Sequence, residues 1–112
     1  MLGLTVRWSL SAAGTGVDEE LAAYVADTSL ARFTGMAGLQ FKTWRTAPGE
    51  WFEGCYVFAS DEARTEFQTT FTAGAADSAV SQIVGSSPLL IEPCDIVAIA
   101  EGWEGFTATP RA

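Results

Sequence analysis

Apolar and polar residues alternate with a period of two in three segments of the sequence, a pattern typical of strands that bury only one face. These segments are residues 2–10, 39–45 and 52–59. The second and third are separated by Pro48 and Gly49, a strong turn signal, and are therefore expected to form a hairpin. A sheet with one buried face needs a second layer to cover it, which restricts this chain to a layered fold.

The covering layer is predicted from two segments with helical spacing. Thr15 and Asp18 form a helix-start signal for a helix that runs to about Phe33, and Ser60 caps a second helix that breaks at Gly74. The stripe expected to be buried on the first helix consists of Leu21, Tyr24, Val25, Thr28, Leu30 and Phe33. The stripe expected on the second helix consists of Ala63, Phe67, Thr70 and Phe71.

A short third helix is expected over residues 76–84 and a last strand over residues 89–100. This element order predicts an α+β fold, a ferredoxin-like four-stranded antiparallel sheet with helices on one face, built as one domain over residues 1–112. The tail from Gly102 has no periodicity, but its aromatic residues favour folding back onto the domain. Hydrophobic residues make up 48% of the chain and aromatic residues 12%, so we expect a homodimer that hides the uncovered sheet face.

The charge balance excludes several functions. With 14 acidic and 6 basic residues the net charge is −8, so the chain lacks the basic surface that nucleic acid requires. The absence of histidine excludes histidine-dependent nucleophiles, histidine-ligated zinc and a proximal haem ligand. Cys55 and Cys94 have no metal-ligand spacing and are interpreted as reduced, which favours a cytoplasmic protein. No signal peptide and no membrane span are expected.

The strings Leu39-Gln40-Phe41-Lys42-Thr43-Trp44 and Gly54-Cys55-Tyr56-Val57-Phe58, the latter followed by Ser60-Asp61-Glu62 at a helix start, carry a family resemblance. The chain resembles the YdhR-like monooxygenases of the dimeric α+β barrel superfamily, which also holds the antibiotic-biosynthesis monooxygenases. The resemblance implies a homodimer, a substrate cavity between sheet and helices, and oxygenation of electron-rich aromatic molecules without metal or flavin. Other members of the superfamily act as cyclases, isomerases, dehalogenases or haem-degrading enzymes, so the fold alone does not specify the reaction.

Three residues are candidates for catalysis. Lys42 is the only lysine and lies one pleat from Trp44, where it could hold a substrate anion, or else form a salt bridge with a carboxylate. Trp44 could stack a planar substrate, or simply pack in the core. Tyr56 could bind a substrate oxygen or pass a proton, or form a structural hydrogen bond.

Further residues are candidates for binding the substrate: Trp8, Tyr24, Phe41, Gly54, Phe58 and Phe67. Gly54 interrupts an aromatic strand face, which indicates close approach by a side chain, a bulge or a ligand. The pattern leaves open which face lines the cavity, the one with Lys42 and Trp44 or the one with Phe41 and Arg45.

The carboxylates expected within strands, those of Glu53, Asp95 and Glu101, are interpreted as partners of Arg7 or Lys42, the alternative being a general base. Arg45 is expected in a surface or interface ion pair. The main functional hypothesis is a cofactor-independent monooxygenase that acts on a planar aromatic or polyketide-like small molecule. Two alternatives remain: a cyclase or isomerase of secondary metabolism, and a non-catalytic dimeric protein that binds a hydrophobic ligand. Oxygen uptake would distinguish the monooxygenase from both alternatives.

Overall fold

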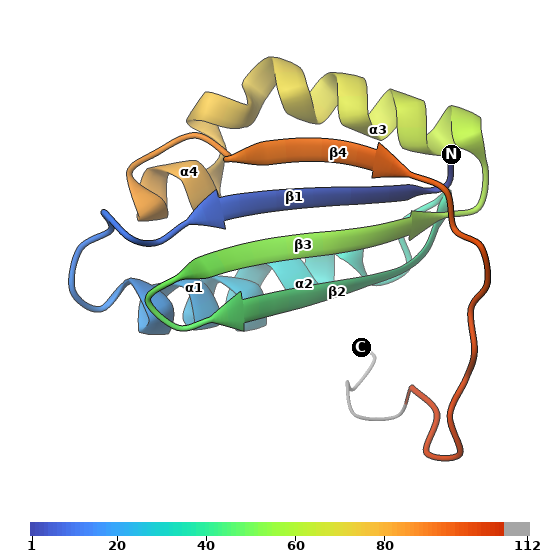
Figure 1. Cartoon of the computed structure of the whole chain (residues 1–112), viewed down its shortest axis with the longest axis horizontal. Coiled ribbons are helices and arrows are strands. Elements are labelled where there is room, and N and C mark those ends of the chain that lie inside the picture. The colour runs from blue at the N-terminus through green and yellow to red at the C-terminus, as the bar shows by residue number, and fades with distance from the viewer. Residues whose placement is uncertain (107–112) are drawn as a thin grey trace.

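Four antiparallel strands form one sheet in the computed structural model of the chain, which describes residues 1–106 (Figure 1). The order across the sheet is β2-β3-β1-β4. The strands are β1 (Gly3–Ser9), β2 (Leu39–Ala47), β3 (Trp51–Phe58) and β4 (Leu90–Cys94). Strands β2 and β3 are joined by the expected turn, in which Gly49 has a φ of 75°. The prediction of an α+β fold with a four-stranded antiparallel sheet is confirmed.

The helical segments pack on one face of the sheet; in Figure 1 the blue-to-cyan segments lie behind the strands and the long yellow helix runs above β4. The first region is continuous and consists of α1 (Val17–Tyr24), the π-helical turn η1 (Val25–Ser29) and α2 (Leu30–Phe33). The second consists of α3 (Asp61–Gly74), the 3₁₀ turn η2 (Ala75–Asp77) and α4 (Ala79–Val84). The opposite face of the sheet has no helix over it in the part of the chain that the structure describes.

The helix starts agree only in part with the sequence signals. The Ser60 hydroxyl accepts a hydrogen bond from the amide of Ala63, as expected for the N-cap of α3. The prediction that Thr15 and Asp18 begin the first helix is wrong, because the N-cap is Gly16 with a φ of 84° and no side chain caps it. The Asp18 carboxylate instead accepts a hydrogen bond at 3.4 Å from the amide of Gly49 in the β2–β3 turn.

The π-helical turn changes which residues of the first helical region face the sheet. A π turn adds one residue to the local repeat, so every later side chain is rotated relative to an α-helix. Thr28, expected to be buried, is therefore exposed, and its neighbour Ser29 is buried with 3% exposure. Phe33 is buried four residues later, as expected.

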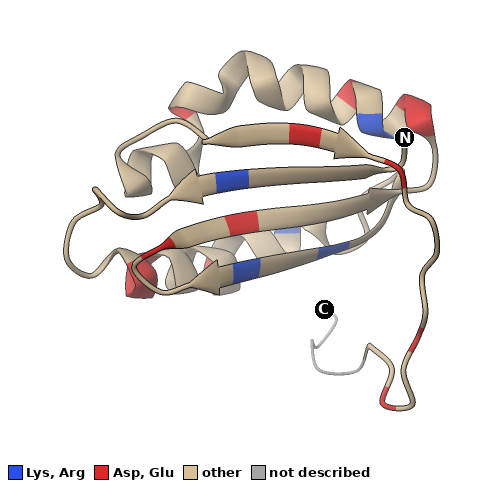
Figure 2. Cartoon of the chain, in the orientation of Figure 1, with Lys and Arg blue, Asp and Glu red and all other residues tan. Residues whose placement is uncertain are grey.

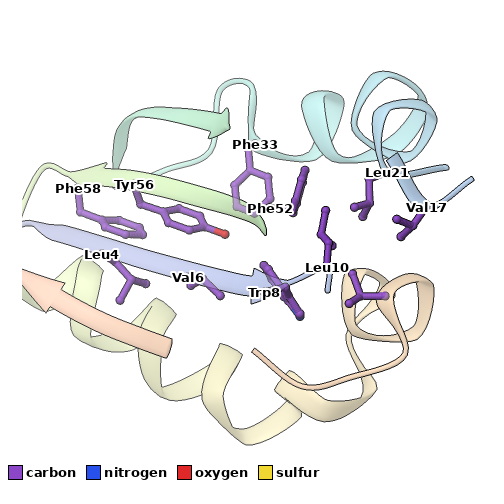
Figure 3. Packing of buried hydrophobic residues seen from close by; sticks show 11 residues of the cluster. Leu4, Val6, Trp8, Leu10, Val17, Leu21, Phe33, Phe52, Tyr56 and Phe58 are labelled. Atoms are coloured by element: carbon purple, nitrogen blue, oxygen red, sulfur yellow. The ribbon is translucent and has the colours of Figure 1, made fainter. Parts of the chain in front are cut away.

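The core lies between the sheet and the helices (Figure 3). Leu4, Val6 and Trp8 of β1 face the helices, and their register with β3 places Tyr56, Gly54 and Phe52 on the same face. The predicted face of β3 is thus confirmed. Phe33 from α2 and Phe67 from α3 pack against this surface through ring contacts of 5.0–6.0 Å.

The last strand is shorter than expected. β4 ends at Cys94 rather than near residue 100. Cys94 pairs with Gly3, the first residue of β1, so β1 has no further residue with which β4 could pair. The following segment leaves the sheet and runs past β2 (Figure 1). Phe106 stacks on Phe41 with 5.8 Å between ring centroids, whereas Trp103 is 99% exposed. The rest of the predicted tail, residues 107–112, lies outside the described residues.

A row of charges crosses the uncovered face of the sheet, seen as blue, red and blue bands on β1, β3 and β2 in Figure 2. Glu53 is only 1% exposed, and its carboxylate accepts hydrogen bonds from Arg7 at 2.8 Å and Arg45 at 2.7 Å. Burial opposes ionisation, but the two arginines outweigh it and hold the pKa of Glu53 below its ordinary value. The expected pairing of Glu53 is confirmed, whereas Asp95 and Glu101 lie outside the strands.

Candidate functional site

A cavity of about 310 Å³ lies between the sheet and the helices. Strands β1, β2 and β3 form its floor, and side chains from both helical regions form its walls and rim. Eight of its 17 lining residues are aromatic. The lining residues from the strands are Trp8, Lys42, Trp44, Phe52, Gly54 and Tyr56, and those from the helical regions are Tyr24, Ser29, Arg32, Phe33, Phe67, Thr70, Phe71, Gly74, Ser78, Ala79 and Val80.

Lys42 is surrounded by aromatic rings. Its Nζ atom lies 3.5 Å from the ring centroid of Phe33, 4.4 Å from that of Tyr56 and 4.5 Å from that of Trp44. Within residues 1–106 no carboxylate forms a salt bridge with this amine, so the salt bridge considered from the sequence does not occur there. The rings can attract a protonated amine through their faces, but they supply no counter-charge.

This environment changes the protonation of Lys42. Burial lowers the pKa of the amine, the positive charge of Arg32 lowers it further, and together they bring it from 10.5 to about 6. Lys42 is therefore mostly uncharged at neutral pH. A neutral amine has a free lone pair, so it can accept a proton from a ligand, which an ordinary surface lysine cannot do at this pH.

Gly54 makes room for Lys42 and Tyr56. A Cβ atom at position 54 would lie 3.1 Å from Lys42 Cε and 3.2 Å from the Tyr56 ring, closer than ordinary packing allows. The prediction that a group approaches the backbone at this glycine is confirmed, and the group consists of two neighbouring side chains. Gly54 therefore leaves room for both side chains close to the backbone of β3.

Tyr56 presents a phenol to the cavity. The residue is 5% exposed, and within the described chain its hydroxyl forms no hydrogen bond with another protein group. Burial raises the pKa of this phenol above its ordinary value, so it remains protonated and can donate to an anionic oxygen. Tyr24 of α1 supplies a second phenol to the lining.

Trp8 also lines the cavity, but its indole N–H already has a hydrogen-bond acceptor. Its indole N–H donates to the Ser81 hydroxyl at 3.0 Å, and Ser81 in turn donates to the carbonyl of Ala75 at 2.7 Å. The ring also packs edge-on against Phe71 at 6.2 Å. Trp8 therefore offers a ligand an apolar surface and no hydrogen bond.

The structure brings most of the candidate residues around one cavity and resolves which strand face lines it. The face with Lys42 and Trp44 does so, and Phe41 and Arg45 lie on the opposite face. Phe58 is buried beside the rings of Tyr56 and Phe67 without lining the cavity. The candidate residues that do line it are Trp8, Tyr24, Lys42, Trp44, Gly54, Tyr56 and Phe67.

Sequence reasoning missed Arg32, Ser29 and the wall formed after α3. Ser29 faces the cavity because of the π turn, for which the sequence carries no clear signal. Arg32 lies beside Phe33 in the last turn of its helix, where an arginine is ordinarily explained by the helix dipole. Its guanidinium lies 4.8 Å over the Phe33 ring, at the cavity.

No protein-family model and no curated protein matches this chain. Among residues 1–106, no group of three or more acidic or cysteine side chains could hold a metal ion. None of the helices in the same range is long and apolar enough to cross a membrane.

Proposed function

We propose that this protein is a cofactor-independent monooxygenase that acts on a planar aromatic molecule with an acidic proton. The main support is the environment of Lys42. Its amine is enclosed by three aromatic rings, has no carboxylate partner in residues 1–106 and has a lowered pKa. The strand order β2-β3-β1-β4 with helices on one face is the one expected for a ferredoxin-like fold, and it supports the resemblance to the YdhR-like monooxygenases.

The cavity supports a planar aromatic ligand. Its volume of about 310 Å³ lies at the lower end of the range for small-molecule sites, which is roughly 300–1,000 Å³. Trp44, Phe33 and Tyr56 offer ring faces and edges on which a flat molecule can stack. Because these rings also exclude water, charges inside the cavity interact more strongly than they would in solvent.

The chemistry begins with proton removal. Lys42 accepts a proton from a phenol or an activated C–H group of the substrate, and the resulting ammonium ion stabilises the substrate anion together with the Tyr56 hydroxyl. The anion transfers one electron to dioxygen, and the two radicals combine to form a C–O bond and a peroxide. For a substrate methylene group the peroxide loses water and leaves a ketone. One oxygen atom is then in the product, the other is in water, and the substrate is the reductant.

The uncovered sheet face is the proposed dimer interface. It carries the Arg7–Glu53–Arg45 row, in which both arginines also lie over the Trp51 ring, at 4.2 and 5.7 Å. A second copy packed on this face would give the dimeric α+β barrel implied by the resemblance. Sedimentation at micromolar concentration tests this part, and a monomer would contradict it.

Oxygen uptake tests the reaction. Purified protein is incubated with hydroxyanthrones and hydroquinones in an oxygen electrode, with the uncatalysed rate subtracted and the products identified by mass spectrometry. We expect one oxygen molecule consumed per product, and a loss of at least roughly tenfold in kcat/KM for Lys42→Met. Arg64→Gln is the matched control, since Arg64 binds Asp61 at 3.1 Å and does not line the cavity.

Two other outcomes would reject the oxygenase proposal. Quenching of tryptophan fluorescence without oxygen uptake or product would indicate a ligand-binding protein. A product formed without oxygen uptake would indicate a cyclase or isomerase. Because Trp8 and Trp44 both line the cavity, fluorescence reports occupancy in each case.

A further inference from the structure

The cavity has a charge opposite to that of the protein. The chain carries 14 acidic and 6 basic residues, yet the described lining includes no aspartate or glutamate. It includes the guanidinium of Arg32 and the amine of Lys42, which becomes cationic when it takes a proton from a ligand. A surface with this excess of acids would be expected to place some of them near any opening. The lining thus favours an anionic ligand over a neutral or cationic one.

Arg32 differs from the other arginines of residues 1–106. Arg7 and Arg45 bind the carboxylate of Glu53, and Arg64 binds that of Asp61. No acidic side chain in this range forms a salt bridge with Arg32. Its guanidinium contacts the Phe33 ring instead, leaving its hydrogen-bond donors available to a ligand.

Arg32 and Lys42 share one aromatic neighbour. The Arg32 guanidinium carbon lies 4.8 Å from the Phe33 ring centroid and the Lys42 amine lies 3.5 Å from it. The two groups therefore lie within the length of one small molecule of each other. Arg32 is exposed to solvent and Lys42 is mostly enclosed, so the arginine is at the mouth of the cavity and the amine is further inside.

We infer that the cavity takes a planar aromatic carboxylate, with the carboxylate bound by Arg32 at the mouth and the ring inserted toward Lys42 among Phe33, Trp44 and Tyr56. This inference rests on the proposed function for the site and adds the class of substrate. A guanidinium matches a carboxylate because two parallel N–H groups can bind both oxygens at once. At the mouth both charges keep part of their hydration, so pairing them costs less than it would inside the cavity.

A pair of matched ligands tests the inference. 3-Hydroxy-2-naphthoate and 3-hydroxy-2-naphthamide have the same ring system and nearly the same shape, and only the first is an anion. Each is titrated into the protein at low salt while tryptophan fluorescence is followed. We expect the carboxylate to bind at least roughly tenfold more tightly than the amide, and this preference to shrink as salt is added.

Variants then assign the preference to one residue. Arg32→Gln is expected to remove the preference, because it weakens binding of the carboxylate much more than binding of the amide, and Arg64→Gln is expected to keep the preference. Circular dichroism verifies that both variants are folded. Equal binding of the two ligands by the unmodified protein would overturn the inference, and so would a preference that survives in Arg32→Gln or that is lost equally in Arg64→Gln.

The two proposals fail in different ways. Oxygen uptake with neutral hydroxyanthrones, without a preference for the carboxylate, would overturn the inference about Arg32 and leave the oxygenase proposal intact. A carboxylate preference that depends on Arg32, without oxygen uptake on any substrate, would reject the oxygenase and support an anion-selective cavity.

Discussion

Replacing Lys42 with methionine changes how the stability of the protein depends on pH. Methionine has an unbranched side chain of similar length, so it can fill the same space among the rings without an ionisable group. In the folded protein the pKa of Lys42 is about 6, whereas in the unfolded chain it returns to its ordinary value of 10.5. Between these two pH values the unfolded state binds one more proton than the folded state.

The sign and size of the effect follow from this difference. Below pH 6 the amine is charged in both states, and the full cost of burying a charge is present. As pH rises from 6 toward 10.5 the folded state holds the neutral amine, and folding becomes more favourable relative to the variant. We expect the free energy of unfolding of the unmodified protein to gain about 1.4 kcal/mol per pH unit over Lys42→Met between pH 7 and 9.

Urea unfolding at pH 7, 8 and 9 measures this difference. Other titratable groups, such as Cys55, are present in both proteins and cancel in the comparison. Arg64→Met is the matched control, because it removes a cation that does not titrate here, so its effect should be independent of pH. Parallel stability curves for the unmodified protein and Lys42→Met would show that the amine is hydrated and ionises normally, and would contradict the proposal that Lys42 acts as a base.

Three further substitutions test the packing and the charges around the site. Gly54→Ala places a methyl group 3.1 Å from Lys42 Cε and should cost about 1–3 kcal/mol of stability, measured by thermal unfolding, together with ligand affinity. Glu53→Gln should cost roughly 1.5–3 kcal/mol at neutral pH. In the folded protein the pKa of Glu53 is lowered from 4.5, so the carboxylate stabilises the fold above pH 4.5. This stabilisation is lost as the pH falls through the folded-state pKa, so the cost of Glu53→Gln should vanish in acid. A cost that is independent of pH would contradict the expectation. Ser81→Ala removes the acceptor of the Trp8 N–H at 3.0 Å and should cost about 1–3 kcal/mol in urea unfolding, with an unchanged midpoint as the contrary result.

The strand faces and the hairpin were predictable because alternation is a local property. A period of two assigns Gly54 and Tyr56 to one face of β3, and register pairing then brings Trp44 and Lys42 of β2 to the same face. The sequence could not say which face meets the helices, since both faces of β2 carry aromatic and basic residues. That choice depends on packing between segments far apart in the chain.

The remaining differences have equally specific causes. The π turn over Val25–Ser29 rotates the end of the first helical region, which buries Ser29 and exposes Thr28, and one inserted residue leaves no mark on an apolar pattern. The end of β4 is decided by the first residue of β1, its pairing partner, and not by residues 95–100 themselves. Neither the π turn nor the end of β4 can be predicted from the neighbouring residues in the sequence.

The register of β2 decides the chemistry of both sheet faces. Arg45 lies opposite Glu53 and shares its carboxylate with Arg7, so this buried acid is paired on the uncovered face. Lys42, an odd number of residues away, lies opposite Tyr56 on the helix face, where no acid reaches it within residues 1–106. A slip of β2 by one residue would exchange the two faces and bring Lys42 to the side of Glu53. An ion pair there would hold the amine in its charged form, so the lowered pKa of Lys42 depends on the register as much as on burial.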